Sequence, residues 1–450
     1  MMPTMAPAGH LETVTAAVYV VVALFLGFAV PLLHHGVWAW ANPDLQRDQV
    51  TTFLSSVSSG MMAFTGIVFS LLFLMLQFST TAYSPHLLPM LARNRTLAHA
   101  GGVFTGTFLY SLMALRGVGA VQGGGTPAVV LWVGFGWLLA SVYLLLRLVR
   151  VFSGLAITDV LEMIGDLGWS QLDRVYSPYA GPVEAVARRL GRGAPAAGTE
   201  TQVLRHAGKP RYVVGLDLPR LVELAVASDT FIRVPLALGD AVTSGVPLAM
   251  VHEAGVRVPE KALRAAIMLD RDRTLEQGPK QAIRLLVDIA IRALSLAVND
   301  PTTAVHALDQ IEAILLRIGN SDLDVGMLFD AREIPRVSYV APSWEDYLDL
   351  ALTEIRQYGA GAVQIERRLC ALLTHLRDQV PDERRPAIDR IAADQSATLR
   401  GAIADASLRR QAEHVDRQGL GHTNGGEAPW PIEGDDPSAL ERTTRSGLGP

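Results

Sequence analysis

Residues 57–79, VSSGMMAFTGIVFSLLFLMLQFS, decide the fold, because they contain no Asp, Glu, Lys or Arg. As a helix rising 1.5 Å per residue, this stretch would extend about 34 Å, enough to cross the roughly 30 Å hydrocarbon core of a bilayer. It lies within a longer run, residues 50–92, that lacks the same four residue types. The sequence therefore predicts a membrane-crossing helix here, followed by a short interfacial piece after Ser84-Pro85.

Three further runs without charged residues lie on either side of this stretch, at residues 13–33, 96–115 and 117–146. The last run becomes helical only after the turn Gly123-Gly124-Gly125-Thr126-Pro127. We expect a transmembrane domain over residues 1–151, with helices near 13–33, 57–79, 97–115 and 128–150. The absence of Asp, Glu, Lys and Arg from the middle of these helices argues against a proton relay or an ion-coupled transporter.

Arginine in the short loops predicts the orientation of these helices. If the chain crosses four times, one side carries Arg93, Arg95, Arg147 and Arg150, and the other carries Arg47 and Arg116. The side with more cations is normally cytoplasmic. We therefore expect a multi-pass protein of the plasma (inner) membrane with both termini in the cytoplasm.

The composition of the whole chain excludes several classes of function. Only 18% of the 450 residues are charged, against about 25% in soluble proteins, and the net charge is −5. An acidic chain lacks the basic surface that nucleic-acid binding requires, so the lipid bilayer is the expected partner. The single cysteine, Cys370, rules out an intrachain disulfide and a thiolate metal cluster. No cofactor and no metal are predicted.

Small and polar residues recur near helical spacing on one face of the second predicted helix. This face comprises Ser55, Ser59, Gly66, Ser70, Gln77, Thr81 and Ser84. Such residues can line a water-filled path, because they offer hydroxyl groups without a fixed charge. They can equally allow helices to pack closely, with hydroxyl groups bonding across the contact. The sequence favours packing and leaves the pore open as an alternative.

The remainder of the chain has the charge content of a globular protein. We divide it into a helical connector (152–210), a small β-rich domain (211–258), a helical cytoplasmic domain (259–411) and a disordered tail (412–450). One long helical pattern covers residues 343–376. The fold class predicted for the whole chain is an α-helical membrane protein with a cytoplasmic α+β region and a helical C-terminal part.

Alternating apolar residues and glycine turns mark strands in the β-rich domain, beginning with residues 211–216. The stretch 239–248, GDAVTSGVPL, resembles the turn of lipoyl- and biotinyl-type half-barrels. Those carriers attach their cofactor to a hairpin lysine, and this chain has none between Lys209 and Lys261. We therefore expect a small β half-barrel that is structural or senses a ligand.

A helix–turn–helix corner follows the β-rich domain. The pattern predicts a helix over 278–297, an ion pair between Asp288 and Arg292, and a second helix capped by Asp300 with Pro301 at its first position. The polar residues that could converge at this corner are Asp288, Arg292, Ser295, Asn299, Asp300, Thr303 and His306. They would form either a capped corner with a local ion pair, which we favour, or a site for a small anion or metal.

Residues 288–304, DIAIRALSLAVNDPTTA, resemble the signature DIA.RALSPA.NDP.TA of a bacterial family of predicted membrane proteins, domain of unknown function 2254. The second predicted helix also resembles the family pattern, through Phe69-Ser70, Gln77-Phe78-Ser79 and Tyr83-Ser84-Pro85. The resemblance extends over roughly residues 10–400. Leu296 replaces an expected proline and Gly278 replaces an expected aspartate, and both changes weaken a binding site at the corner. The resemblance implies insertion into a membrane, and the family name assigns no particular activity.

No catalytic motif of the kind HExxH, GxxxxGK or GxSxG occurs in the sequence, so we do not expect an enzyme. The leading hypothesis is a homo-oligomeric channel-like pore, or its gate, for ions or small solutes. The alternative is a membrane-anchored cytoplasmic sensor or scaffold without transport activity, in which the half-barrel or the corner binds a ligand or partner.

Overall fold

The computed structural model describes residues 8–32, 44–82, 95–120, 126–153, 157–176, 178, 200–252, 257–271 and 278–417. The chain divides into two compact units, Met1–Val160 and Leu161–Pro450. Ser84 and the predicted interfacial piece lie outside the described residues, as does the predicted tail beyond residue 417.

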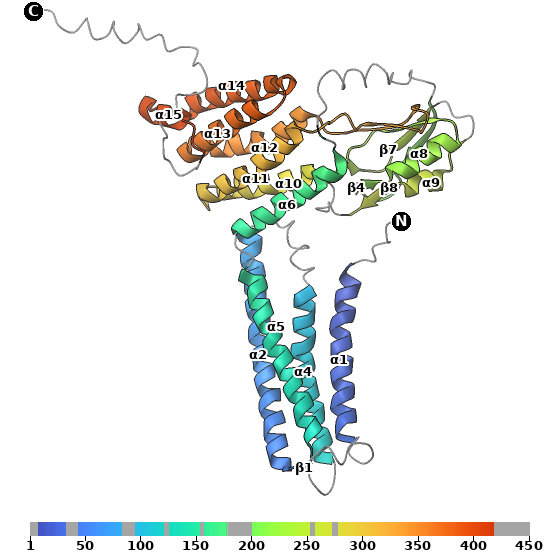
Figure 1. The fold of residues 1–450 in the computed structure, drawn as a ribbon, viewed down its shortest axis with the longest axis vertical. Helices are drawn as coiled ribbons and strands as arrows, with labels where there is room; N and C mark the ends of the chain where they lie inside the picture. Colours follow the sequence, from blue (N-terminus) through green and yellow to red (C-terminus); the bar gives the residue numbers. More distant parts are fainter. Residues whose placement is uncertain are drawn as a thin grey trace, which may run out of the picture. The chain divides into compact units, whose positions relative to one another are not determined.

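The first unit consists of four long helices (Figure 1). They are α1 (Ala8–Leu32), α2 (Arg47–Ala82), α4 (Arg95–Ala120) and α5 (Ala128–Ser153). Among the described residues, three stretches are long and apolar enough to cross a membrane: Val14–Pro31, Arg47–Ser70 and Ala128–Val151. The stretch Arg47–Ser70 begins ten residues before the predicted crossing at 57–79. Both lie within α2, which is one continuous helix from Arg47 to Ala82. The third predicted crossing falls within α4, which is not among these stretches.

A short strand pair fixes the direction of the helices. β1 (Asp44–Leu45) pairs antiparallel with β2 (Thr126–Pro127), so the α1–α2 connection and the α4–α5 connection meet at one end of the unit. It follows that α1 and α4 run parallel to each other, and that α2 and α5 run in the opposite direction.

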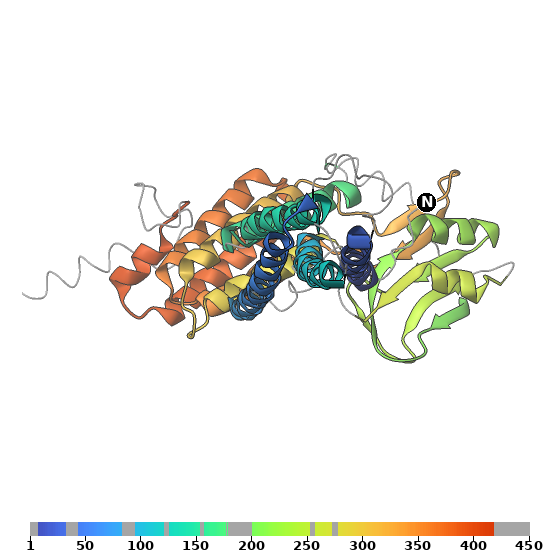
Figure 2. The ribbon, with the colours of Figure 1, turned by 90° about the horizontal axis from the view of Figure 1, so that it is seen from below.

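Helix α4 is the central helix of this unit and contacts the other three (Figure 2). Phe104, Tyr110 and Ala114 of α4 are fully buried. Glycines allow the close approach: a Cβ atom at Gly102 would lie 2.8 Å from the Tyr19 ring, and one at Gly106 would lie 2.8 Å from the Trp137 ring. These two glycines form a GxxxG pair, which is typical of tightly packed membrane helices. Because close packing favours glycine and other small residues, α4 is less apolar than α1 and α5.

The second unit contains a β-rich part with two sheets. The five-stranded sheet has the order β3 (Glu200–Arg205), β7 (Pro247–His252), β5 (Phe231–Val234), β10 (Pro335–Tyr339) and β9 (Met327–Phe329). Its neighbours are antiparallel except for β5 and β10, which are parallel. The three-stranded sheet has the order β6 (Ala241–Val242), β4 (Arg211–Leu216) and β8 (Ile267–Asp270).

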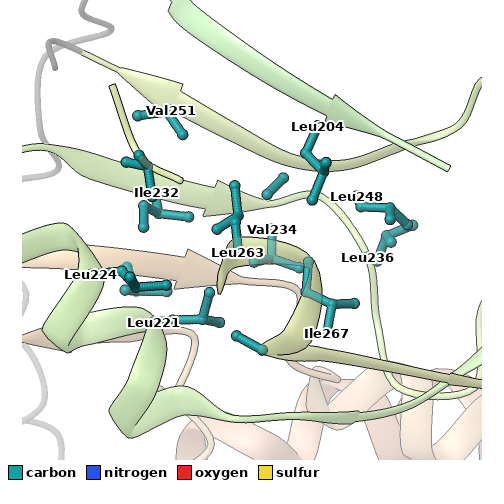
Figure 3. Close-up of a cluster of buried hydrophobic side chains, with 14 of the residues drawn as sticks. Leu204, Leu221, Leu224, Ile232, Val234, Leu236, Leu248, Val251, Leu263 and Ile267 are labelled. Atoms are coloured by element: carbon teal, nitrogen blue, oxygen red, sulfur yellow. The ribbon is translucent and has the colours of Figure 1, made fainter. Parts of the chain in front are cut away.

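One apolar core joins the two sheets with α8 (Leu218–Ala227) and α9 (Glu260–Ala265). Leu204 and Ile232 from the larger sheet, Ile267 from the smaller, and Leu221 from α8 point into it (Figure 3). The strands extend beyond the predicted boundaries 211–258. β3 lies in the predicted helical connector and β8, β9 and β10 lie in the predicted helical domain, because pairing with distant strands rather than local pattern makes them strands.

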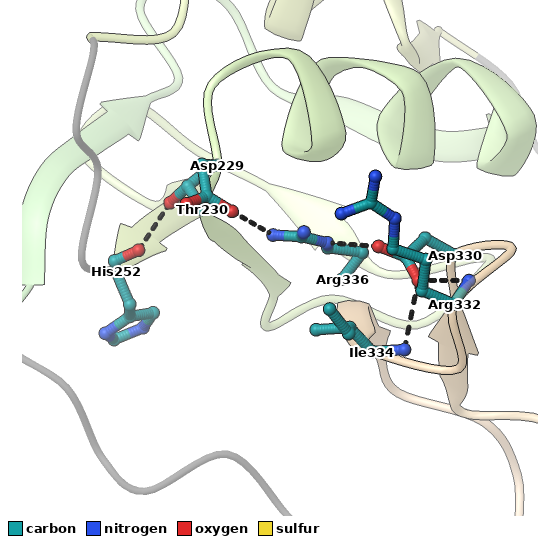
Figure 4. A network of polar contacts seen from close by, with 7 residues as sticks. All are labelled: Asp229, Thr230, His252, Asp330, Arg332, Ile334 and Arg336. Carbon is teal, nitrogen blue, oxygen red and sulfur yellow. Dashed lines mark hydrogen bonds and ion pairs between the residues drawn. The ribbon is translucent and has the colours of Figure 1, made fainter.

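An arginine ties the β9–β10 hairpin to the residues that follow α8. Arg336 donates from Nε to Asp330 (2.9 Å) and from Nη1 to Asp229 (2.9 Å) (Figure 4). The Arg336 guanidinium lowers the pKa of the Asp330 carboxyl, which also accepts from the backbone N–H groups of Arg332 and Ile334. Asp229 has a φ of 44°. This contact joins segments about 100 residues apart.

The remaining helices of the second unit form its helical part. They are α6 (Ile157–Val175), α10 (Pro279–Ala293), α11 (Pro301–Gly319), α12 (Trp344–Gly359), α13 (Val363–Gln379), α14 (Arg385–Ala402) and α15 (Ala406–Glu413). Helix α10 ends four residues before the predicted helix. The single helix predicted over 343–376 is two helices, because the chain turns at Gly361, which has a φ of 87°.

Candidate functional site

The polar face of α2 points away from the other helices of its unit. Ser55, Ser59, Gly66 and Ser70 are exposed, whereas the apolar residues Leu54 and Val57 are buried against the neighbouring helices. A Cβ atom at Gly66 would meet nothing within 4 Å. At Ser55, Ser59, Gly66 and Ser70, the polar face is therefore not covered by the described helices of the first unit.

The serine hydroxyl groups on this face bond to the backbone of their own helix. Ser59 donates to the carbonyl of Ser55 (3.0 Å), and Ser70 donates to the carbonyl of Gly66 (2.8 Å). Ser55 donates to the carbonyl of Thr52 (3.0 Å). Each hydroxyl oxygen keeps lone pairs that can accept further hydrogen bonds. Gln77 is also exposed, the side chain of Thr81 lies outside the described residues, and so does Ser84.

Eight exposed residues of α2 follow a seven-residue repeat. Two interleaved series, each with a spacing of seven, form a stripe that we name the α2 seam. It comprises Thr52, Ser56, Ser59, Ala63, Gly66, Ser70, Phe73 and Gln77. Alternating steps of four and three residues place them at the a and d positions of heptads, which are the contact positions in left-handed helix pairs. Six of the eight side chains are those of Gly, Ala, Ser or Thr, which permit close approach of helices.

The outward faces of α1 and α5 are different. Phe25 and Phe28 of α1 and Trp132, Phe135 and Leu139 of α5 are exposed. These large apolar side chains suit contact with lipid tails. The α2 seam is thus an outward surface rich in small and polar residues, and it lies beside exposed apolar side chains of the same helix, such as Met62 and Ile67.

Polar side chains inside the unit have partners on neighbouring helices. Thr107 of α4 bonds to Ser141 of α5 (2.8 Å between the hydroxyl oxygens), and Tyr110 donates to the carbonyl of Val130 (2.7 Å). The hydroxyl of Tyr19 lies 3.0 Å from Nδ1 of His99. The sequence reasoning did not single out these residues, although a histidine or a threonine inside an uncharged run is a signal that could have done so.

The predicted corner between α10 and α11 is a tight capped turn. Asp300 caps α11 by accepting from the N–H of Thr303 (3.1 Å) and from its hydroxyl (2.6 Å), which confirms the predicted cap. Ser295 donates to the carbonyl of Arg292 (2.7 Å), and Asn299 has a φ of 50°. Leu296, which replaces the expected proline, is fully exposed at the tip, with a relative exposure of 104%.

An ion pair that the sequence did not predict lies near this corner. Asp288 accepts from Arg284 (2.5 Å), one turn before it. Arg284 also donates to Glu354 of α12 (2.6 Å), and this bond lowers the pKa of the Glu354 carboxyl. Asp288 is therefore occupied in a contact between α10 and α12, and the bonds around Asp300 are local. His306, on the second turn of α11, is half-buried. In the part of the chain that the structure describes, no group of three His, Cys, Asp or Glu side chains could hold a metal.

The sequence did not predict the buried charged side chains between α11 and α13. Arg368 of α13 donates to Asp309 (2.8 Å) and to Glu312 of α11, and Glu312 also contacts Nδ1 of His375 (2.5 Å). Burial raises the pKa of Glu366, while bonds from the N–H of Gly361 and from Gln395 oppose that rise. These networks hold the helices together, because a buried charge is stable only with close partners.

Comparison with known proteins agrees with this architecture. Residues 13–375 match the family described as predicted membrane protein, domain of unknown function 2254. An uncharacterized protein of Mycobacterium bovis and one of Mycobacterium tuberculosis are each 29% identical over 379 residues, covering 80% of this chain and 68% of the relative. No solved structure matches the chain.

Proposed function

The chain belongs to the domain of unknown function 2254 family of predicted membrane proteins, and from this premise we propose that it forms a homo-oligomeric, channel-like path for ions or small solutes, lined by α2. The single observation that carries the proposal is the outward direction of the α2 seam. Large apolar side chains cover the outward faces of α1 and α5, as contact with lipid requires. The seam of α2 instead fits other copies of α2.

The heptad spacing favours a ring of helices. When several helices surround an axis through heptad contacts, their a and d side chains point toward that axis. The side chains of Ser59, Gly66 and Ser70 would then face the centre of the assembly. The small volume at these positions leaves room for water, and the hydroxyl oxygens of Ser59 and Ser70 can replace part of the hydration shell of a cation.

We propose four crossings, with α4 as the fourth membrane helix. α4 is 26 residues long and antiparallel to α2 and α5, and its buried position removes the need for a strongly apolar surface. Arg47 and Arg116 lie near the end marked by the β1–β2 pair, whereas Arg147 and Arg150 lie at the opposite end of α5. This distribution supports cytoplasmic termini in the plasma (inner) membrane. We also propose that the protein has no catalytic activity. For the β-rich part we propose the form of a half-barrel.

Disulfide crosslinking tests the assembly. In a Cys370→Ala background, which has no other cysteine, Ser59→Cys should form dimers on mild oxidation of native membranes. Leu139→Cys, on the exposed face of α5, is the matched control and should remain monomeric. Equal crosslinking of the two variants would contradict assembly through α2.

Planar bilayers containing the purified protein test the path. We expect steady conductance that Gly66→Leu abolishes, because a leucine at each copy would fill the space around the axis. Leu139→Ala should leave the conductance unchanged. Crosslinking at Ser59 without any conductance would contradict the path and leave the sensor or scaffold as the function of the assembly.

A further inference from the structure

Three consecutive charged residues of α13 are almost completely buried. Glu366, Arg367 and Arg368 have relative exposures of 0%, 6% and 4%. Because successive residues on a helix are about 100° apart, the three side chains point in three different directions. Each therefore depends on a different neighbouring segment for its partner.

Two of the three charges have close partners. Glu366 accepts from Gln395 of α14 and from the N–H of Gly361 (3.3 Å). Arg368 is bound by Asp309 and Glu312 of α11. These two contacts have the geometry expected of buried charges.

Arg367 differs from its neighbours. Its Nε and Nη2 atoms are buried and have no hydrogen-bond partner within the described ranges. Its ion-pair partner among the described residues is Asp416, whose Oδ2 lies 3.9 Å from Nη2, beyond hydrogen-bond distance. Nε and Nη2 form one edge of the guanidinium, and this edge binds planar oxyanions through two parallel bonds.

The segment that carries Asp416 buries few of its residues. We name residues 405–416, which include α15, the C-terminal strap. Ala412 and Asp416 are its buried residues, and Ala412 packs beside Leu399 and Ile403. The N–H of Asp416 donates to the carbonyl of Arg367 over a long 3.4 Å. Most other residues of the strap are exposed.

We propose that the Nε–Nη2 edge of Arg367 is a binding site for an oxyanion, either a carboxylate or a phosphate, and that such a ligand replaces Asp416 and opens the C-terminal strap. Asp416 has the chemistry of the ligand, since it is itself a carboxylate aimed at the guanidinium. A ligand that bonds to both nitrogen atoms would satisfy donors that Asp416 leaves unsatisfied. The buried, incompletely paired arginine therefore favours exchange. The proposal concerns the second unit and does not depend on the path through the membrane.

Cys370 provides a reporter for the strap, because it is the single cysteine of the chain. It lies about one turn after Arg367 on α13. Burial raises the pKa of its thiol to about 12, and the carboxylates of Glu366 and Glu413 contribute to this rise. Because Glu413 belongs to the strap, opening should both expose the thiol and remove one of the charges that keep it protonated.

The experiment measures the rate at which N-ethylmaleimide modifies Cys370 in the full-length protein in detergent. Sodium phosphate, sodium acetate and sodium chloride are compared at equal ionic strength and pH. We expect phosphate or acetate to increase the rate by up to about fivefold over chloride, the factor set by loss of one weak ion pair. If phosphate increases the modification rate more than acetate does, the ligand of Arg367 is a phosphate. If acetate increases the rate more, the ligand is a carboxylate. Equal rates in the three salts would overturn the proposal.

Two variants assign the effect to the proposed site. Asp416→Asn removes the competing carboxylate, so modification should be faster without an oxyanion, and the response should occur at lower anion concentration. Asp378→Asn makes the same charge change at an exposed position of α13 and should behave as the wild type. Wild-type rates and anion response in Asp416→Asn would refute the role of the strap.

Arg367→Lys retains the charge and loses the planar edge. It should keep the wild-type unfolding temperature within a few degrees and lose the response to phosphate and acetate. If this variant unfolds, Arg367→Gln combined with Asp416→Asn removes both charges and should likewise show no anion response. A wild-type response in either folded variant would place the oxyanion elsewhere.

Discussion

Helices α4 and α2 of the first unit both carry glycines, and Gly102 and Gly106 of α4 have surroundings opposite to those of Gly60 and Gly66 of α2. A Cβ atom at Gly102 or Gly106 of α4 would approach a neighbouring ring to 2.8 Å, whereas one at Gly60 or Gly66 of α2 would meet nothing within 4 Å. Small residues allow helices to approach closely. In α4 the partner belongs to the same chain, and in α2 the partner that we propose is another copy.

The largest expected effect comes from filling the α4 contact. Gly106→Leu would force the side chain into the Trp137 ring and toward Ala23, so we expect a loss of about 3 kcal/mol of stability or failure to fold. Gly66→Leu, in the α2 seam, should leave the unfolding temperature of the detergent-solubilised monomer unchanged. Tryptophan fluorescence during heating measures both. A similar loss in the two variants would show that the α2 seam is covered within the chain.

A matched pair of alanine substitutions should give changes of opposite sign. Gly102→Ala must move the Tyr19 ring or the backbone of Ala16, which lies 3.1 Å from the added carbon, and should destabilise by about 1–2 kcal/mol. Gly60→Ala adds helix propensity in open space and should stabilise by up to about 1 kcal/mol. Thermal unfolding in the same detergent compares them. Stabilisation by Gly102→Ala would refute the tight α1–α4 contact.

The smallest effect concerns hydroxyl groups. Thr107→Val removes the buried bond between α4 and α5 and should cost about 0.6 kcal/mol, the average for such bonds between membrane helices. Ser59→Ala removes a bond within α2 only, and should have no measurable effect on the monomer. Chemical unfolding in mixed micelles resolves this difference. An equal loss from Ser59→Ala would imply an unseen partner within the same chain.

The sequence predicts the parts of this fold that depend on local pattern. The helices α1 and α5 follow from apolar runs that contain no charge, and the cap of α11 follows from Asp300 beside Pro301. The polar face of α2 is also recognisable in the sequence, because its residues recur near helical spacing. These features are local, because a membrane span or a cap requires only neighbouring residues.

Contacts between distant segments could not be predicted in the same way. Arg284 binds Asp288 on its own helix and also Glu354 of α12, which lies 70 residues further along the chain. Strand β3 lies in a sequence that reads as a connection, and it becomes a strand because β7, more than 40 residues later, pairs with it. The spacing of the polar residues of α2 shows that they share one face of the helix. It does not show whether this face points toward α4 or away from it, because that depends on how the helices pack.

The three buried charges of α13 have a consequence for motion in the helical part of the second unit. Rotation of α13 about its axis, or a slide by one residue, would break the contacts of Glu366 and Arg368 at the same time and leave both charges without partners in an apolar interior. Such a step is too costly to occur during ordinary function. Spectroscopic probes placed on exposed positions of α13 therefore provide a stationary reference from which the displacement of neighbouring segments can be measured.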